Sequence, residues 1–144
     1  MDFSLGPYIK KDLKHIKIRS AEEDIENHYK IFRGKIEESG NIEEIKNPCS
    51  VPSVNFLYET IIEGIVVYFF KDRCATTNPK RSPRQGLRII FALFIVNKKP
   101  VKYVPFIVFL AEDEGKRYIA PNRKRYQLTS SFFKHIIEAK LKYL

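Results

Sequence analysis

Apolar residues follow a helical period in the first part of the chain. From residue 20 to residue 40 they recur every three or four positions, which predicts an amphipathic helix. Its apolar stripe consists of Ile25, Tyr29, Phe32 and Ile36. Ser20 with Glu23 three residues later is typical of a helix start, and Gly40 can adopt the left-handed conformation common at a helix end. We therefore expect the helix to begin after Ser20 and to end at Gly40.

Shorter elements are predicted around this helix and at the end of the chain. Residues 15–19 alternate polar and apolar, as in a half-buried strand, and residues 41–46 favour a second short helix before Pro48. Residues 129–144 return to a helical period. The expected packing face of this C-terminal helix consists of Phe133, Ile137, Leu141 and Leu144.

The middle of the chain is rich in β-branched and aromatic residues, which favours strands. Residues 65–70 form the clearest run, and residues 87–96 are apolar on both faces. The second pattern predicts an interior strand that is covered on each side. Residues 103–110 form a third run, in which Pro105 lacks a backbone donor, so this strand should be at an edge or bulged.

The order of these elements is β-α-α-β-β-β-α. This order, without an internal repeat or a linker, predicts one α+β domain over residues 1–144. Residues 1–14 precede the first predicted element, and we expect them to be peripheral.

Charge adds a second asymmetry to the chain. The formal net charge is +9 over 144 residues. Residues 1–70 carry 9 Lys and Arg against 12 Asp and Glu, whereas residues 71–144 carry 17 against 5. The two net charges, −3 and +12, add to the total of +9. Such polarisation predicts one electropositive face and a polyanionic partner, either nucleic acid or an acidic protein or membrane surface.

Most of this positive charge falls in two polar loops. The first, residues 71–88, contains two prolines and a glycine, so little regular structure is expected there. Its cations are Lys71, Arg73, Lys80, Arg81, Arg84 and Arg88. The second loop contributes Lys116, Arg117, Arg123, Lys124 and Arg125, interleaved with Tyr118 and Tyr126. If the three strands pair antiparallel in order, Lys71 and Arg88 share one end of the sheet and both loops flank one cleft.

A cleft of cations and tyrosines suits RNA, because cations neutralise phosphates and aromatic rings stack on unpaired bases. It also suits RNA cleavage without a metal, in which the 2′-hydroxyl attacks phosphorus and cations stabilise the resulting charge. A Lys, Tyr or His would then supply the acid and the base. The acidic run 112–114 could bind a divalent cation or form a solvated turn, and His15, His28 and His135 are far apart. We expect no metal and no cofactor.

The compartment is also constrained by the sequence. Cys49 and Cys74 have no metal-ligand spacing, and the first residues do not resemble a secretory leader, which indicates a reducing, cytoplasmic setting. The longest apolar runs are too short to cross a bilayer, so no membrane partner is expected.

Several stretches together resemble the RelE superfamily of bacterial toxins, which are ribosome-dependent mRNA interferases, and most of all its YafO branch. The likeness runs from about residue 15 to the C-terminus. It rests on "IKIRSAEEDIENHYKIFRGKIEESG", the basic loop through "GLRIIF", "PFIVFLAEDEG" and the helix introduced by "PNRKRYQL". The resemblance implies a small twisted antiparallel sheet flanked by an N-terminal helical hairpin and a C-terminal helix. It further implies a type II toxin that cleaves mRNA on the ribosome and a cognate antitoxin that covers the basic surface.

The resemblance also implies roles for individual residues. By position, the catalytic candidates are Lys71, Arg73, Arg88, Arg117, Arg123, Tyr126 and His135. The RNA-binding candidates are Lys80, Arg81, Arg84, Lys116, Tyr118, Lys124 and Arg125. Structural alternatives stay open: Arg88 could cap the sheet or pair with Glu112, Tyr126 could anchor the helix, and His135 could be a surface residue. Two other functions stay open as well, a noncatalytic RNA- or DNA-binding module and a basic domain that binds an acidic protein.

Overall fold

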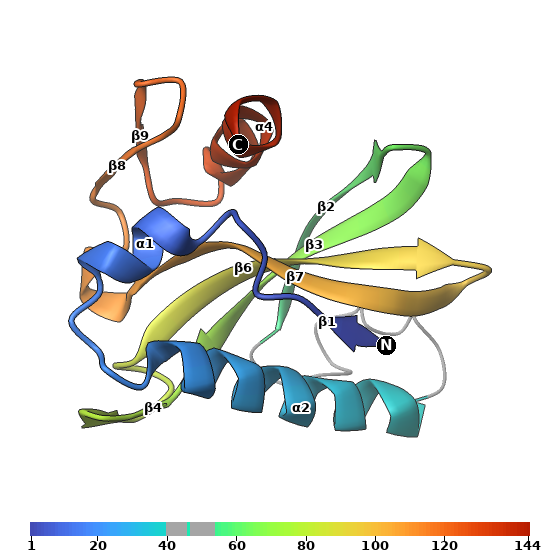
Figure 1. Ribbon diagram of the computed structural model, residues 1–144, viewed down its shortest axis with the longest axis horizontal. Helices are drawn as coiled ribbons and strands as arrows, with labels where there is room; N and C mark the ends of the chain where they lie inside the picture. The colour runs from blue at the N-terminus through green and yellow to red at the C-terminus, as the bar shows by residue number, and fades with distance from the viewer. Residues whose placement is uncertain (40–45, 47–53) are drawn as a thin grey trace.

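The structure is a computed structural model that describes residues 1–39, 46 and 54–144 (Figure 1). In this part of the chain the helices are α1 (Lys10–His15), α2 (Ala21–Ser39), the 3-10 turn η1 (Ala111–Asp113) and α4 (Phe133–Tyr143). The strands are β1 (Asp2–Phe3), β2 (Asn55–Ile62), β3 (Ile65–Cys74), β4 (Thr76–Thr77), β5 (Lys80–Arg81), β6 (Leu87–Val96), β7 (Lys99–Leu110), β8 (Arg117–Ile119) and β9 (Arg125–Gln127). The α+β class is confirmed.

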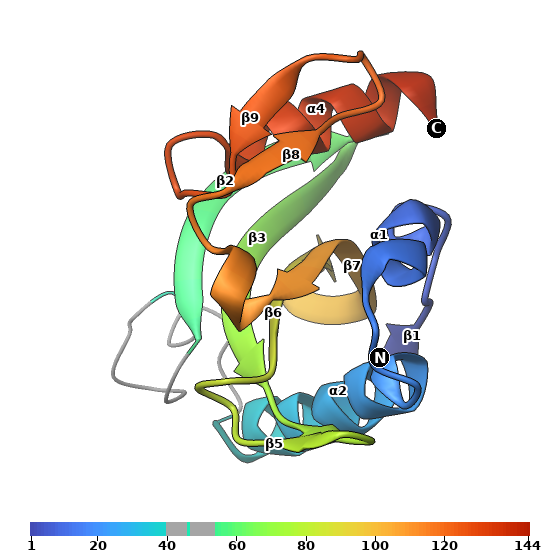
Figure 2. The same cartoon turned by 90° about the vertical axis from the view of Figure 1, so that its left-hand side faces the viewer.

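The main sheet has five strands in the order β1-β7-β6-β3-β2. Strands β3, β6 and β7 pair antiparallel, as expected. Strand β2, which was not predicted, pairs antiparallel with β3, and β1 pairs parallel with β7, so the sheet is mixed. The sheet lies between α2 on one face and α4 on the other (Figures 1 and 2). Two small ribbons, β4–β5 and β8–β9, extend from it.

Each face of the sheet has its own apolar core. On the α2 face, Phe32 packs edge-on against Phe91, and Phe91 stacks on Tyr103 with ring centroids 4.4 Å apart. On the other face, Phe133 of α4 packs with Phe109. Strand β6 is buried on both faces over most of its length, which confirms the predicted interior strand. The predicted stripe of α2 is also confirmed, because all four of its side chains are buried.

Pro105 has the expected effect on β7. The register of β7 against β6 shifts between Ile90, which faces Ile107, and Phe91, which faces Pro105. The ladder therefore gains one extra residue on β7 at this point, as a bulge does. The predicted bulge next to Pro105 is confirmed.

The N-terminal predictions were wrong in two respects. Residues 10–15 form the helix α1, and residues 16–20 connect it to α2, so no strand occupies 15–19. Residues 1–14 are not peripheral, because β1 pairs with β7, Ile9 is buried and the side chain of Asp12 is buried. The reason is long-range: Lys140 of α4 donates to Asp12 at 2.9 Å, and the local pattern around Asp12 cannot show that partner.

The first basic loop contains more regular structure than predicted. Strand β3 continues to Cys74, and β4 and β5 form a ribbon. Alternation explains the extension, since Asp72 and Cys74 point into the α2 face while Lys71 and Arg73 point to the other. Asp72 is buried and its Oδ2 lies 2.7 Å from Nε2 of His28 on α2.

Helix α2 begins after Ser20, as predicted, but the side-chain hydrogen bonds at its start and the packing face of α4 differ from prediction. The Ser20 hydroxyl donates to Asp24 at 2.6 Å and accepts from the amide of Asn78, so Asp24 is its helix partner. Leu144 is exposed, and the packing face of α4 includes Ile136 and Lys140 instead. The helix predicted at 41–46 and the helix end at Gly40 lie outside the described residues, apart from residue 46. No helix in the described part of the chain is long and apolar enough to cross a membrane.

Candidate active site

Strand pairing brings three predicted cations to one end and one face of the sheet. Arg73 of β3 stands directly opposite Arg88 of β6, and Lys71 lies two residues before Arg73 on the same face. This is the face that α4 covers, and Nζ of Lys71 lies 5.7 Å from the ring centre of Phe133, the first residue of α4. The three cations therefore lie next to the apolar surface that α4 covers.

A cleft of about 640 Å³ opens beside these side chains. It is lined by Arg73, Arg81, Arg84, Gln85, Arg88, Ala111, Glu112 and Glu114. The four arginines come from β3, β5, β6 and the loop before β6, which is the segment that the sequence singled out. The other wall comes from η1 and the residue that follows it. We call this the arginine cleft.

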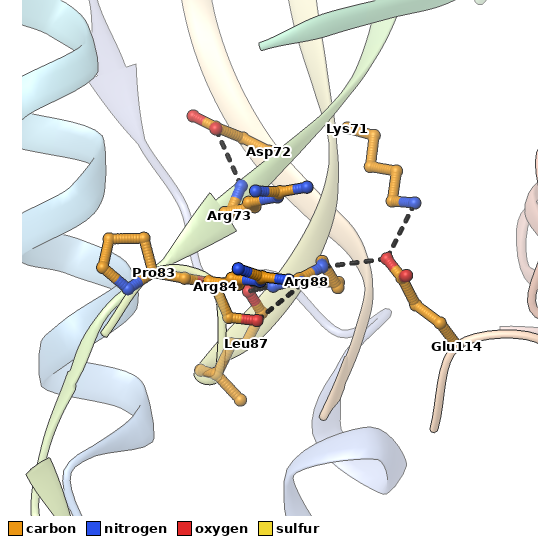
Figure 3. Close-up of polar contacts among 8 residues, drawn as sticks. All are labelled: Lys71, Asp72, Arg73, Pro83, Arg84, Leu87, Arg88 and Glu114. Atoms are coloured by element: carbon orange, nitrogen blue, oxygen red, sulfur yellow. Dashed lines mark hydrogen bonds and ion pairs between the residues drawn. The ribbon is translucent and has the colours of Figure 1, made fainter. Parts of the chain in front are cut away.

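Glu114 connects the two walls of the arginine cleft (Figure 3). Its Oε1 accepts from Nζ of Lys71 at 2.9 Å and from Nε of Arg88 at 2.8 Å. Partial burial alone would raise the pKa of Glu114, but the hydrogen bonds and charges of Lys71 and Arg88 outweigh it. The pKa of Glu114 is therefore lowered from its ordinary value of 4.5, and the carboxylate is ionised at neutral pH.

Arg88 holds the loop that forms the cleft. Besides the bond to Glu114, its guanidinium donates to the carbonyl oxygens of Pro83 at 2.9 Å and Arg84 at 2.8 Å (Figure 3). Its side chain is only 6% exposed. With donors committed in three directions, Arg88 positions Glu114 and the loop, and the acid that it pairs with is Glu114 and not Glu112.

Other arginines of the cleft have open donors. Arg73 and Arg84 are exposed, and among the described residues neither guanidinium has an ion-pair partner. The Arg81 guanidinium lies 3.6 Å from Glu112, a loose exposed contact. Lys80 is exposed on β5 and does not line the cleft. Arg73 and Arg84 are therefore the groups best able to receive an anion.

The second basic loop does not bring its cations to this cleft. Two acids of the same loop, Glu112 and Glu114, do line the cleft, because they lie close to the end of β7, within and just after η1. Lys116 pairs with Asp113 at 3.2 Å, and Arg117 borders another cavity, of about 320 Å³, with Asp12. The expectation that both sets of cations flank one cleft was wrong. The remaining cations, Arg123, Lys124 and Arg125, belong to the β8–β9 hairpin and its turn.

The aromatic candidates also lie outside the arginine cleft. The Tyr118 hydroxyl donates to Asp12, and burial together with Asp12 raises its pKa, so Tyr118 anchors β8 to α1. Tyr126 stacks on His135, with ring centres 5.7 Å apart and planes 10° apart, and Asn122 donates to the Tyr126 hydroxyl. Tyr126 and His135 meet beside a separate cavity of about 330 Å³. The structure thus brings these two together, away from Arg73 and Arg88.

The buried thiol of Cys74 and the grouping of His, Cys, Asp and Glu side chains bear on two other kinds of chemistry. Burial, with Asp24 and Asp72 nearby, raises the pKa of the Cys74 thiol to about 12, so the thiolate is scarce. Among residues 1–39, 46 and 54–144, no three His, Cys, Asp or Glu side chains gather as metal ligands would.

Glu114 is the functional candidate that sequence reasoning missed. The sequence predicts a cation site or a solvated turn at 112–114, and neither prediction places one carboxylate between two cations of other strands. The available signal was its position four residues after the end of β7, at the end of the sheet where Lys71 and Arg88 were expected to meet. Compared with known proteins, the chain matches no family model, no curated protein and no solved structure, so its resemblance to RelE-type toxins stays a prediction.

Proposed function

We propose that this chain is the toxin of a type II toxin–antitoxin system, an endoribonuclease that cleaves mRNA on the ribosome without a metal. One observation carries the proposal: an ionised Glu114 is held between Lys71 and Arg88 at the border of a cleft lined by four arginines. The sequence resemblance to the YafO branch of RelE toxins supports the same chemistry. The proposed setting is the cytosol, where a cognate antitoxin would cover the cleft.

The proposed reaction is an internal transfer at phosphorus. The ribose 2′-oxygen forms a bond to the adjacent phosphorus while the bond from phosphorus to the 5′-oxygen breaks. The products are a 2′,3′-cyclic phosphate and a 5′-hydroxyl, so no water and no oxidant are consumed. The phosphorane between them carries extra negative charge, which preorganised cations stabilise.

Each role is assigned to a group at the cleft. Glu114 accepts the proton of the 2′-hydroxyl, and Lys71 donates a proton to the leaving 5′-oxygen. The 2.9 Å contact between them lets that proton return from Glu114 to Lys71 after the reaction. Arg73 and Arg84, whose guanidinium groups have no ion-pair partner among the described residues, contact the phosphorane oxygens. Arg88 positions Glu114.

Inducible expression tests the proposal directly. The wild-type chain should arrest growth, and primer extension should map cuts inside reading frames that disappear when translation is blocked. The Arg73→Ala, Arg84→Ala double variant should be folded and should leave mRNA uncut. The matched control is Lys30→Ala with Lys99→Ala, which removes the same charge at exposed positions outside the cleft.

Other outcomes would identify a different function. A chain that shifts RNA on a gel with a steep salt dependence, and leaves it intact, is a noncatalytic binding module. A chain that ignores RNA at physiological salt and captures an acidic protein is an interaction domain. Either result overturns the nuclease proposal.

A further inference from the structure

The β8–β9 hairpin is a second basic surface, apart from the arginine cleft. Figures 1 and 2 both place it beside α4, on the opposite side of the sheet from α2 and the β4–β5 ribbon. Its cations, with those at its base and turn, are Lys116, Arg117, Arg123, Lys124 and Arg125. Among the described residues only Lys116 of this set has an ion pair. The remaining four positive charges are exposed and uncompensated.

Strand alternation gives the hairpin two different faces. Tyr118 and Tyr126 are directly opposite each other and half-buried toward the protein. The pairs Arg117–Gln127 and Ile119–Arg125 face outward, and all four side chains are exposed. Ile119 is 65% exposed, so its side chain is accessible to a binding partner. The outer face therefore displays two guanidinium groups, one amide and one methyl-rich side chain.

The hairpin is held rigidly from its inner face. The Tyr118 hydroxyl donates to Asp12, which accepts from the buried Lys140, and Tyr126 stacks on His135. The turn is closed by two 2.9 Å backbone bonds, from Ala120 to the Lys124 carbonyl and from Arg123 to the Ala120 carbonyl. The outward side chains are thus presented at fixed spacing, which reduces the entropy lost on binding.

We propose that the outer face of the β8–β9 hairpin binds in the major groove of duplex DNA. That groove is about 12 Å wide and admits a two-stranded ribbon, whereas the major groove of A-form RNA is too deep and narrow. Arg117 and Arg125 match the acceptor pair of guanine, Gln127 matches the edge of adenine, and Ile119 matches the methyl group of thymine. Arg123 and Lys124 in the turn contact flanking phosphates.

The proposal does not depend on RNA cleavage, because the hairpin and the arginine cleft share no cation. A DNA-binding protein without nuclease activity would satisfy it, and a nuclease without DNA binding would overturn it. The two proposals therefore fail separately.

The test uses the full chain and a fluorescently labelled DNA duplex of random sequence, with Kd measured by anisotropy over a range of salt concentrations. The Arg123→Ala, Lys124→Ala double variant, at the proposed phosphate contacts, should weaken binding by about tenfold or more and reduce the salt slope by about 2. The control variant Lys30→Ala, Lys99→Ala, which removes the same charge at exposed positions outside the hairpin, should bind as the wild type does. Equal Kd and slope for the hairpin variant would overturn the proposal.

Uncharged variants test groove reading without changing the charge. From a randomised duplex library the wild type should enrich a preferred sequence, and Ile119→Ala or Gln127→Ala should change that sequence while the salt slope stays constant. Failure to enrich any sequence would contradict major-groove reading. So would binding of single-stranded RNA as tightly as duplex DNA, because the surface would then be a general polyanion site.

Discussion

Two networks of this protein place a lysine against a carboxylate, and they differ in almost every other respect. Asp12 and Lys140 are each only 2% exposed, and Lys140 also donates to the carbonyls of Tyr8 and Phe106. Glu114 is 40% exposed and shares one oxygen between Lys71 and Arg88 at the rim of a cleft. One network is enclosed and fully bonded, while the other borders open space.

The difference separates a structural network from a candidate catalytic one. Asp12 accepts from Lys140, Tyr118 and the amide of Val108, so α1, α4, β7 and β8 meet at one carboxylate. Burial lowers the pKa of Lys140 although Asp12 opposes the shift, so the charged pair depends on keeping every partner. Glu114 has room beside it for a substrate. Removing a partner should therefore harm the fold at Asp12 and the activity at Glu114.

The largest expected effect is at the enclosed network. Asp12→Ala leaves the Lys140 ammonium buried without its counter-charge, and should lower the free energy of unfolding by about 3–5 kcal/mol. Urea denaturation measures the loss. The exposed pair Arg33–Glu37 is the control, because Glu37→Ala should leave the midpoint almost unchanged. A urea midpoint for Asp12→Ala equal to that of the wild type would show that the Asp12–Lys140 network does not stabilise the fold.

A second variant should separate activity from stability. Glu114→Gln keeps the shape of the side chain and removes the proposed base, so the proposed RNA cleavage should fall by about 100-fold or more. Its urea midpoint should stay close to that of the wild type, since Glu114 is partly exposed. Single-turnover cleavage of ribosome-bound mRNA is the measurement. Wild-type cleavage by a folded Glu114→Gln protein would remove Glu114 from the mechanism.

Acid pH should reveal the charges that surround Glu114. The pKa of Glu114 is lowered in the folded state, so its ionised form stabilises the fold at pH values above 4.5, the ordinary pKa of the group. This contribution is lost as the pH falls through the lower pKa of the folded state. The acid limb of the pH–rate profile should accordingly lie below pH 4.5. Lys71→Met removes one cause of the lowered pKa and should move the acid limb of the residual activity upward. An unmoved limb would show that Lys71 does not act on Glu114.

The smallest effect is expected at Tyr126 and His135. Because this stacked pair lies beside a cavity separate from the arginine cleft, His135→Ala should change cleavage by less than about twofold. The same assay on ribosome-bound mRNA checks it. A large loss of cleavage with an intact fold would mean that the RNA contacts both cavities. The site of cleavage would then include the Tyr126–His135 pair as well as the arginine cleft.

Much of the frame could be predicted because its causes are local. The stripe from Ile25 to Ile36 has a helical period. Residues 87–96 are apolar on both faces of a strand, and this pattern is visible without knowledge of what covers them. Pro105 lacks a donor in any fold, so a bulge or an edge follows from its chemistry. The shared sheet end of Lys71 and Arg88 followed from antiparallel order alone.

The local pattern was least informative where a charged residue depends on a distant partner. Asp12 in a lysine-rich segment has the pattern of a surface residue, yet Lys140, far along the chain, makes its burial favourable. Arg88 has the pattern of an exposed strand-end cation, yet the carbonyls of Pro83 and Arg84 and the carboxylate of Glu114 enclose it.

By itself, the sequence determined the α+β class, the interior strand β6 and the concentration of arginines before it, since periodicity and composition act over a few residues. Only the tertiary structure decided that Glu114 enters between Lys71 and Arg88, and that the cations of residues 117–125 turn away onto a hairpin. Those outcomes depend on strand register and on contacts between residues that are distant in the chain, such as Tyr118 with Asp12, which no local pattern encodes.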